Sequence, residues 1–267
     1  MIRLFNGKVF VCCLLFFTMS LSTRAQDPDP LPLPSISEEV ISDSLRALIN
    51  IDVDSLTNKI LGPNVLEFCG SPVNLDRRDR NAKLRRELEV MSHYSSVLIA
   101  RANYYFPRVE PILKANNIPD DFKYLMVVES LMDPNAVSPK GAAGLWQFMP
   151  KTAENYGLVV NDRIDERYQI IKATDAACRY LRAAYEKFGD WVAVAQSYNI
   201  GQTRIQGELA RQDVDDAIDL KLVDETNRYV YRILATKIIF TNPTNFGVSS
   251  NALYYKRLQQ LMHQLVW

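Results

Sequence analysis

Glu129 is the residue of this chain whose surroundings most favour acid–base chemistry. Apolar residues 125–128 precede it on an expected helix, and Pro134 cannot continue that helix. The glutamate therefore falls in the last helical turn, beside a loop that contains Gly141 and Gly144. A carboxyl group among apolar side chains has a raised pKa, which suits a general acid. On residue type alone, a glutamate near a helix end is more often a solvated surface charge.

The residues around Glu129 form a long motif, which favours acid–base chemistry over a solvated surface charge. Glu129-Ser130 is followed by the pattern Pro-x-Ala-x-Ser from Pro134, by Gly141, and by Gly-Leu-Trp-Gln-Phe-Met-Pro from Gly144. This stretch resembles the lytic transglycosylases that have a goose-type lysozyme-like (SLT) catalytic domain. The resemblance implies an all-α, lysozyme-like fold with an active-site groove between helices, and it implies that Glu129 is the catalytic residue.

Two further motifs carry groups that a glycan groove needs, namely aromatic faces and amide or hydroxyl groups. Residues 195–201 resemble the family motif Ala-x-x-Tyr-Asn-Ala-Gly, which places Tyr198 and Asn199 opposite the glutamate. Residues 225–230 resemble Glu-Thr-x-x-Tyr-Val, which makes Tyr229 a candidate to orient Glu129 by a hydroxyl hydrogen bond. The alternative for Tyr198 and Asn199 is a core tyrosine followed by a helix end at Gly201. We interpret Glu225 as a helix-start carboxylate.

The resemblance implies further substrate contacts within the first motif. Ser138, expected near the muramoyl N-acetyl group, and Gln147 match family positions that bind substrate. Met149 and the neighbouring Phe148 fit the groove and the core about equally well.

The expected activity is peptidoglycan cleavage without hydrolysis. The resemblance implies that Glu129 first protonates the β-1,4 bond between N-acetylmuramic acid (MurNAc) and N-acetylglucosamine (GlcNAc), and then accepts the proton of the muramoyl C6 hydroxyl, leaving a 1,6-anhydro-MurNAc end. Ordinary glycosidases use two carboxylates. A hydrolytic muramidase would need a second one, such as Asp133 or Asp162, and a non-catalytic peptidoglycan-binding protein remains the alternative from another class.

The composition narrows the choice of partners. The 267 residues include 31 basic and 31 acidic ones, so no net charge favours nucleic acid. The basic run of residues 77–86 is interpreted as a solvated helix face. His93 and His263, with Cys69 and Cys178, show no metal-ligand spacing, and we expect neither metal nor cofactor. We expect Cys178 to be a buried free thiol, although pairing with Cys69 stays open.

The chain divides into five expected parts. Residues 1–25 read as a secretory signal peptide, residues 26–37 as a proline-rich linker, and residues 38–79 as a peripheral segment. Residues 80–245 form the catalytic domain, and residues 246–267 are a tail too short for the LysM repeats that many relatives carry. We expect a periplasmic protein that binds glycan strands. A lipid anchor at Cys12 is disfavoured because Val11 precedes it, and peripheral membrane association stays open.

Apolar periodicity places most helices of this domain. One long helix is expected over 80–105, with a new one starting at Pro107, and Asp120 is expected to cap a helix that begins at Phe122. Residues 69–72 are expected to be a loop. The remaining expected helices cover 152–156, 174–188, 191–198 and 225–240.

Overall fold

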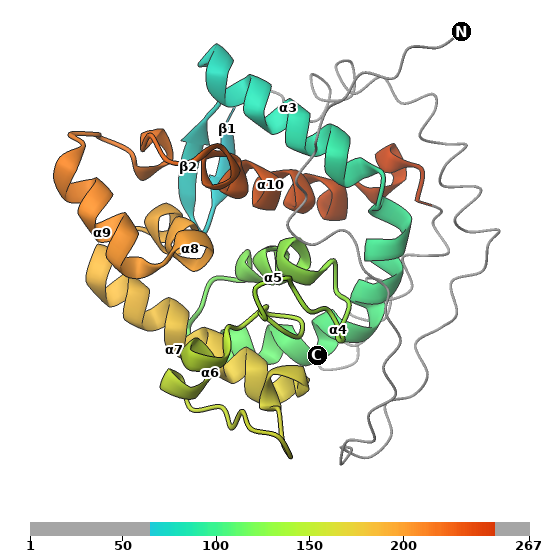
Figure 1. Ribbon diagram of the computed structural model, residues 1–267. Helices are drawn as coiled ribbons and strands as arrows, with labels where there is room; N and C mark the ends of the chain where they lie inside the picture. Colours follow the sequence, from blue (N-terminus) through green and yellow to red (C-terminus); the bar gives the residue numbers. More distant parts are fainter. Residues whose placement is uncertain (1–64, 249–267) are drawn as a thin grey trace, which may run out of the picture.

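The computed structural model describes residues 65–248, which fold into an all-α domain with one small hairpin (Figure 1). The expected signal peptide, the proline-rich linker and most of the two flanking segments lie outside the described residues. The hairpin consists of β1 (Val65–Phe68) and β2 (Ser71–Asn74), and the α-helices are α3 (Arg78–Ser92), α4 (Ser95–Ala115), α5 (Phe122–Ser130), α6 (Pro150–Asn155), α7 (Ile170–Phe188), α8 (Trp191–Ile200), α9 (Gln202–Arg211) and α10 (Asp224–Thr241). Three short 3₁₀ turns complete the fold: η1 (Glu166–Tyr168), η2 (Ala217–Asp219) and η3 (Pro243–Phe246).

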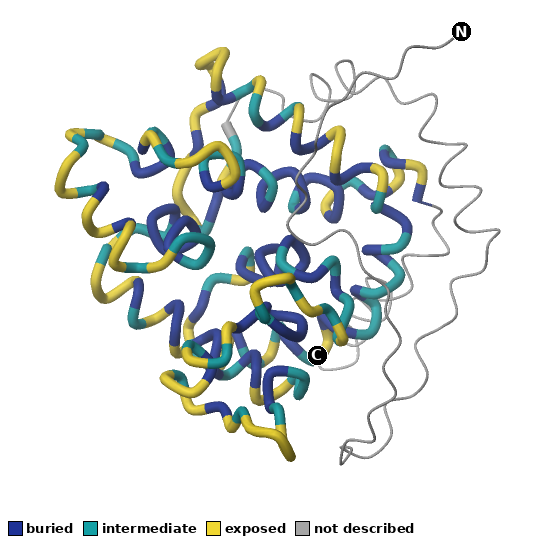
Figure 2. The backbone as a smooth tube through the Cα atoms, in the orientation of Figure 1, coloured by how far each residue is buried: buried dark blue, intermediate teal, exposed yellow. Residues whose placement is uncertain are grey.

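Helix α10 is the central element of the domain. It packs against α3 along much of its length and also contacts α5 and α8, while α4 packs on α7 (Figure 1). The buried residues lie on the inward sides of these helices, and the outward sides are exposed (Figure 2). The expected helices 174–188, 191–198 and 225–240 are present, and each extends beyond the expected bounds. Helix α9 was not predicted.

The hairpin replaces the loop that the sequence led us to expect at residues 69–72. Its strands are antiparallel, with Phe68 opposite Ser71. Both linking residues have positive φ, 53° at Cys69 and 85° at Gly70, as a two-residue hairpin turn requires. Phe68 and Val73 are buried in the same core as the helices, so the folded unit begins before residue 80.

The first long helix breaks at a different place from the predicted one. α3 ends at Ser92 and α4 begins at Ser95, so the expected helix over 80–105 is two helices. Pro107 does not start a helix, because both Pro107 and Pro111 lie inside α4. The buried positions of α4 continue through this region, and tertiary packing therefore outweighs the local preference of proline for a helix start.

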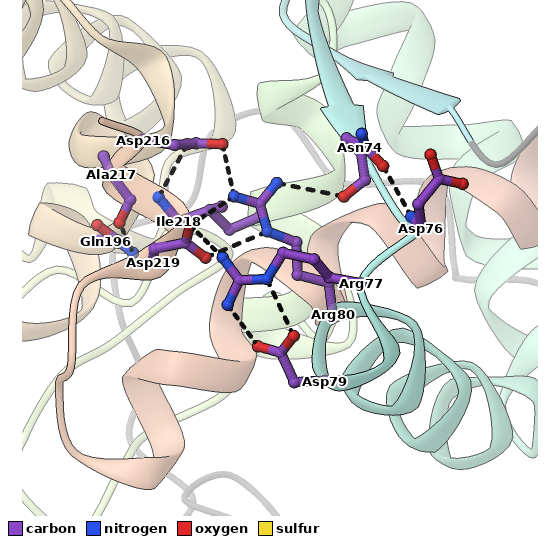
Figure 3. A network of polar contacts seen from close by, with 10 residues as sticks. All are labelled: Asn74, Asp76, Arg77, Asp79, Arg80, Gln196, Asp216, Ala217, Ile218 and Asp219. Carbon is purple, nitrogen blue, oxygen red and sulfur yellow. Dashed lines mark hydrogen bonds and ion pairs between the residues drawn. The ribbon is translucent and has the colours of Figure 1, made fainter. Parts of the chain in front are cut away.

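The basic run at the start of α3 is a solvated face only in part, because two of its arginines form a polar network with η2 (Figure 3), whereas Arg78 and Arg86 are exposed. Arg80 is only 5 % exposed, and its guanidinium contacts Asp216 at 2.9 Å and Asp219 at 2.7 Å. Arg77 also reaches Asp219, at 2.6 Å. These ion pairs join the start of α3 to η2, about 140 residues further along the chain.

Two smaller findings concern the thiol state of the cysteines and the ability of the described helices to span a membrane. Cys69 and Cys178 are both free thiols, and Cys178 is buried as expected. Within residues 65–248, no helix combines the length and the apolar character that crossing a bilayer requires.

Candidate active site

Glu129 lies in the last turn of α5, and the chain leaves that turn in an unusual conformation. Leu131 and Met132 both have positive φ, 50° and 57°, so the helix ends at Ser130, four residues before Pro134. The carbonyl of Leu131 accepts a hydrogen bond from Arg101 on α4 at 2.8 Å. Asp120 does not cap the start of α5; its carboxylate pairs with Lys123 instead. Lys123 also pairs with a second carboxylate, that of Glu110 on α4.

The carboxylate of Glu129 accepts a hydrogen bond from the hydroxyl of Tyr229 on α10. Tyr229 is 2 % exposed, whereas Glu129 is half-buried. This contact joins the end of α5 to the first half of α10. The sequence motif suggested this geometry, and the structure places the two groups in contact.

Burial raises the pKa of Glu129 from 4.5 to about 7. The hydrogen bond from Tyr229 and the charge of Arg232 lower the pKa, and the charge of Glu225 raises it, but desolvation outweighs these contributions. The carboxyl group therefore changes protonation state near neutral pH. A group of this kind can both give and take a proton during one reaction.

The loop after α5 is held in a fixed shape by Gly144 and Arg167. Gly144 has φ +77°, and a β-carbon there would lie 2.1 Å from the carbonyl oxygen of Arg167. The Arg167 guanidinium donates to the carbonyl of Gly141 at 2.7 Å and to that of Phe148 at 3.0 Å. It is oriented in turn by Asp165, which also caps η1. Nothing in the sequence pattern pointed to Arg167.

Three predicted substrate-binding residues lie on this loop. The Ser138 hydroxyl accepts a hydrogen bond from the backbone of Ala142 at 3.0 Å. The Gln147 amide donates to the carbonyls of Gly144 and Ala136, at 2.8 and 3.0 Å. Met149 is 40 % exposed, whereas the neighbouring Phe148 is buried. Ser138 and Gln147 therefore hold the loop together, and Met149 presents its side chain to solvent.

Tyr198 and Asn199, at the end of α8, are tied to both sides of the site. The Tyr198 hydroxyl donates to the carbonyl of Trp146 at 2.8 Å, and its ring contacts that of Phe148. Oδ1 of Asn199 accepts a hydrogen bond from Thr226 on α10 at 2.6 Å. The pKa of Tyr198 is raised well above its usual value, by burial and then by the charge of Glu129. The structure thus brings Tyr198 and Tyr229 together around Glu129.

The two candidates for a second catalytic carboxylate lie in a turn and in an exposed loop. Asp133 accepts a hydrogen bond from the backbone of Asn135 at 2.9 Å, which is a turn contact. Asp162 is exposed in the loop before η1. Of the described carboxylates, the one whose charge acts on Glu129 is Glu225, which lies in the first turn of α10 as predicted. Among residues 65–248, no cluster of His, Cys, Asp or Glu could hold a metal ion.

Comparison with known proteins finds a family match over most of this site. Residues 110–220 match the family model described as "Transglycosylase SLT domain". The matched region includes Glu129, Ser138, Gln147 and Asn199, while Tyr229 lies beyond it.

Relatives match the chain over a longer stretch. Membrane-bound lytic murein transglycosylase D of Escherichia coli (strain K12) is 33 % identical over 184 residues, which is 67 % of this chain and 40 % of that protein. Membrane-bound lytic murein transglycosylase F of Marinobacter nauticus is 32 % identical over 133 residues, or 43 % of this chain and 25 % of the relative. The chain thus spans about two fifths of the length of the first relative. A solved structure of an inactive mutant of lytic transglycosylase Slt from Pseudomonas aeruginosa aligns with 18 % identity and a TM-score of 0.47, over 78 % of this chain and 34 % of that one.

Proposed function

We propose that this chain is a peptidoglycan lytic transglycosylase with Glu129 as its single acid–base group. The proposal is carried by the Glu129 carboxyl group, which accepts a hydrogen bond from the Tyr229 hydroxyl and whose pKa burial raises to about 7. It lies inside the region that matches the transglycosylase SLT domain, and the relatives named above are murein transglycosylases. The substrate is the glycan strand of peptidoglycan, and the scissile bond is the β-1,4 bond from MurNAc to GlcNAc.

The reaction has two proton transfers by the same carboxyl group. Protonated Glu129 first donates its proton to the glycosidic oxygen as the bond from C1 of MurNAc to that oxygen breaks. The resulting carboxylate then accepts the proton of the C6 hydroxyl while O6 bonds to C1. The products are a 1,6-anhydro-MurNAc end and a free GlcNAc hydroxyl, and no water is consumed. A pKa near the working pH allows both transfers.

The substrate contacts in this proposal come from the loop and from α8. Met149, which is exposed, and the half-buried Tyr198 and Asn199 offer an apolar side chain, an aromatic ring and an amide beside Glu129. Ser138 and Gln147 keep hydrogen-bonding capacity beyond their loop contacts, because a hydroxyl can still donate and an amide oxygen can still accept. Tyr229 orients the acid.

We also propose a periplasmic location for the protein, supported by the secretory signal pattern at residues 1–25. The printed names of two relatives describe them as membrane-bound. Peripheral association of this chain with a membrane is compatible with both observations.

Mass spectrometry of soluble products is the experiment that tests the activity. Purified chain is incubated with purified peptidoglycan, and the released muropeptides are weighed. Products lighter by one water, with anhydro-muramoyl ends, are expected. Reducing ends would instead identify a muramidase. Glu225 would then be the first candidate for the second carboxylate, because it is the described carboxylate whose charge acts on Glu129.

Glu129→Gln is the matched variant for this assay. It keeps the shape and hydrogen-bonding capacity of the side chain and removes the acid, so product release should fall by at least about a hundredfold while glycan binding is retained. Undiminished release would overturn the assignment of Glu129. Binding without release by the unaltered chain would support a non-catalytic peptidoglycan-binding protein.

A further inference from the structure

One face of α10 carries two opposite charges on either side of Tyr229. Glu225, Tyr229 and Arg232 are spaced four and three residues apart, so they lie on the same side of the helix. Tyr229 fixes which side this is, because its hydroxyl contacts Glu129. Glu225 is exposed in the first helical turn, whereas Arg232 is partly buried. The two charges act on Glu129 in opposite directions.

Arg232 does not have the freedom of a surface arginine. Its Nε donates to Oε2 of Glu87 on α3 at 2.6 Å. The Glu87 side chain is fully buried, with 0 % exposure, and its other oxygen accepts from Arg228 at 2.7 Å. A buried carboxylate with two cationic partners holds each of them in one geometry.

We propose that Arg232 is a positioning residue for the proposed transglycosylase reaction: clamped by buried Glu87, it keeps a fixed positive charge on the α10 face that meets Glu129. The inference rests on the proposed function. Neither arginine nor Glu87 touches substrate in this role. Arg228 holds Glu87 and also pairs with the exposed Asp224, at 3.1 Å.

The effect of this charge follows from the groups that surround the acid. Tyr229 from α10, Tyr198 from α8 and Tyr180 from α7 are phenols whose pKa values are raised, that of Tyr180 to about 12, so they stay neutral during the reaction. The ionised neighbours are Glu225 and Arg232. Arg232 therefore favours the carboxylate form of Glu129 against burial, and this carboxylate is the form that accepts the C6 hydroxyl proton.

Arg232→Gln and Arg228→Gln form a matched pair that tests the proposal. Each removes one partner of Glu87, but only Arg232 acts on Glu129. The side-chain carboxyl of Glu129 is titrated by ¹³C NMR in each variant, assigned by its loss in Glu129→Gln, and the pH dependence of anhydro-product release is measured in parallel. Arg232→Lys keeps the charge and serves as the conservative rescue.

The expected result is a shift of the Glu129 titration midpoint that occurs in Arg232→Gln and not in Arg228→Gln. Losing one partly screened positive charge should move the titration midpoint and the alkaline limb of activity to higher pH by on the order of half a pH unit. At a pH above the midpoint, this shift makes the protonated fraction of Glu129 roughly three times as large. Arg228→Gln should keep the original midpoint, and Arg232→Lys should restore it.

The outcomes separate this inference from the proposed function. Equal midpoints in Arg232→Gln and Arg228→Gln would overturn the positioning role even if both variants cleave peptidoglycan. A chain that releases no anhydro product would overturn the function, while the NMR titration would still decide whether Arg232 acts on Glu129. If Arg232→Gln does not fold, Arg232→Lys still tests the proposal, because a titration midpoint that differs from that of the wild type, although the charge is kept, would contradict it.

Discussion

The hydroxyl of Tyr229 donates to Oε1 of Glu129, although 100 residues separate the two in the sequence. The bond connects the end of α5 with the central helix α10. It also restricts the rotation of the carboxyl group, because Oε1 is held by the Tyr229 hydroxyl. The acid therefore has a fixed orientation before substrate binds.

Tyr229→Phe should raise the pKa of Glu129 above about 7, because the hydrogen bond from Tyr229 lowers it in the folded protein. The alkaline limb of the activity profile should move to higher pH, and kcat should fall about tenfold through loss of orientation. Tyr198→Phe is the control, since its hydroxyl donates to Trp146 and not to Glu129. If the alkaline limb of the Tyr229→Phe profile stays at the wild-type pH, the hydrogen bond from Tyr229 does not act on the Glu129 carboxyl group.

Glu129→Gln should stabilise the protein at alkaline pH. The folded-state pKa of about 7 lies above the ordinary value of 4.5, so between these values the folded protein binds more protons than the unfolded chain. The free energy of unfolding therefore falls as pH rises through this window, by about 1–3 kcal/mol. Urea unfolding at pH 8 should find the variant more stable than wild type by this amount, and at pH 4 the two should be equal. A wild-type protein that is the more stable one at pH 8 would contradict the raised pKa.

Gly144→Ala should destabilise the domain by about 3 kcal/mol, because the new β-carbon would meet the carbonyl of Arg167 at 2.1 Å in a backbone conformation with φ +77°. Gly141→Ala is the matched control in the same loop. Its φ is +85°, but no atom lies within 4 Å of the added carbon, so only the backbone strain of about 1 kcal/mol remains. Thermal unfolding measures both. Equal melting temperatures would mean that the loop moves away from Arg167 at little cost.

Glu87→Gln should cost about 3–5 kcal/mol of stability, because it leaves Arg228 and Arg232 without their buried counter-ion. Glu154→Gln breaks an exposed pair with Lys151, 3.5 Å apart, and should cost less than about 1 kcal/mol. Chemical unfolding of the two variants at pH 7 gives the comparison. A Glu87 variant as stable as the Glu154 variant would show that α3 and α10 hold together without the clamp.

The sequence by itself indicated most of the helical segments and nominated Glu129 as the candidate acid. Apolar periodicity correctly indicated the end of α7 at Phe188, where Gly189 follows with φ 65°. The motif around Glu129 indicated the acid because a catalytic loop needs particular residues at adjacent positions. Where local signals competed with packing, the predictions were wrong. Pro107 lies inside α4 because the buried face of that helix continues past it, and Asp120 pairs with Lys123 instead of capping α5.

The tertiary structure alone decided which distant side chains meet around Glu129. Tyr229 could be nominated from a motif, but its contact with Glu129 depends on how α10 packs on α5. Arg167 and Glu87 carried no signal at all, because an arginine that braces a loop and a glutamate that is fully buried look like surface charges in a sequence. Burial sets the pKa of Glu129, and burial is a property of the packed helices that no local pattern of residues contains.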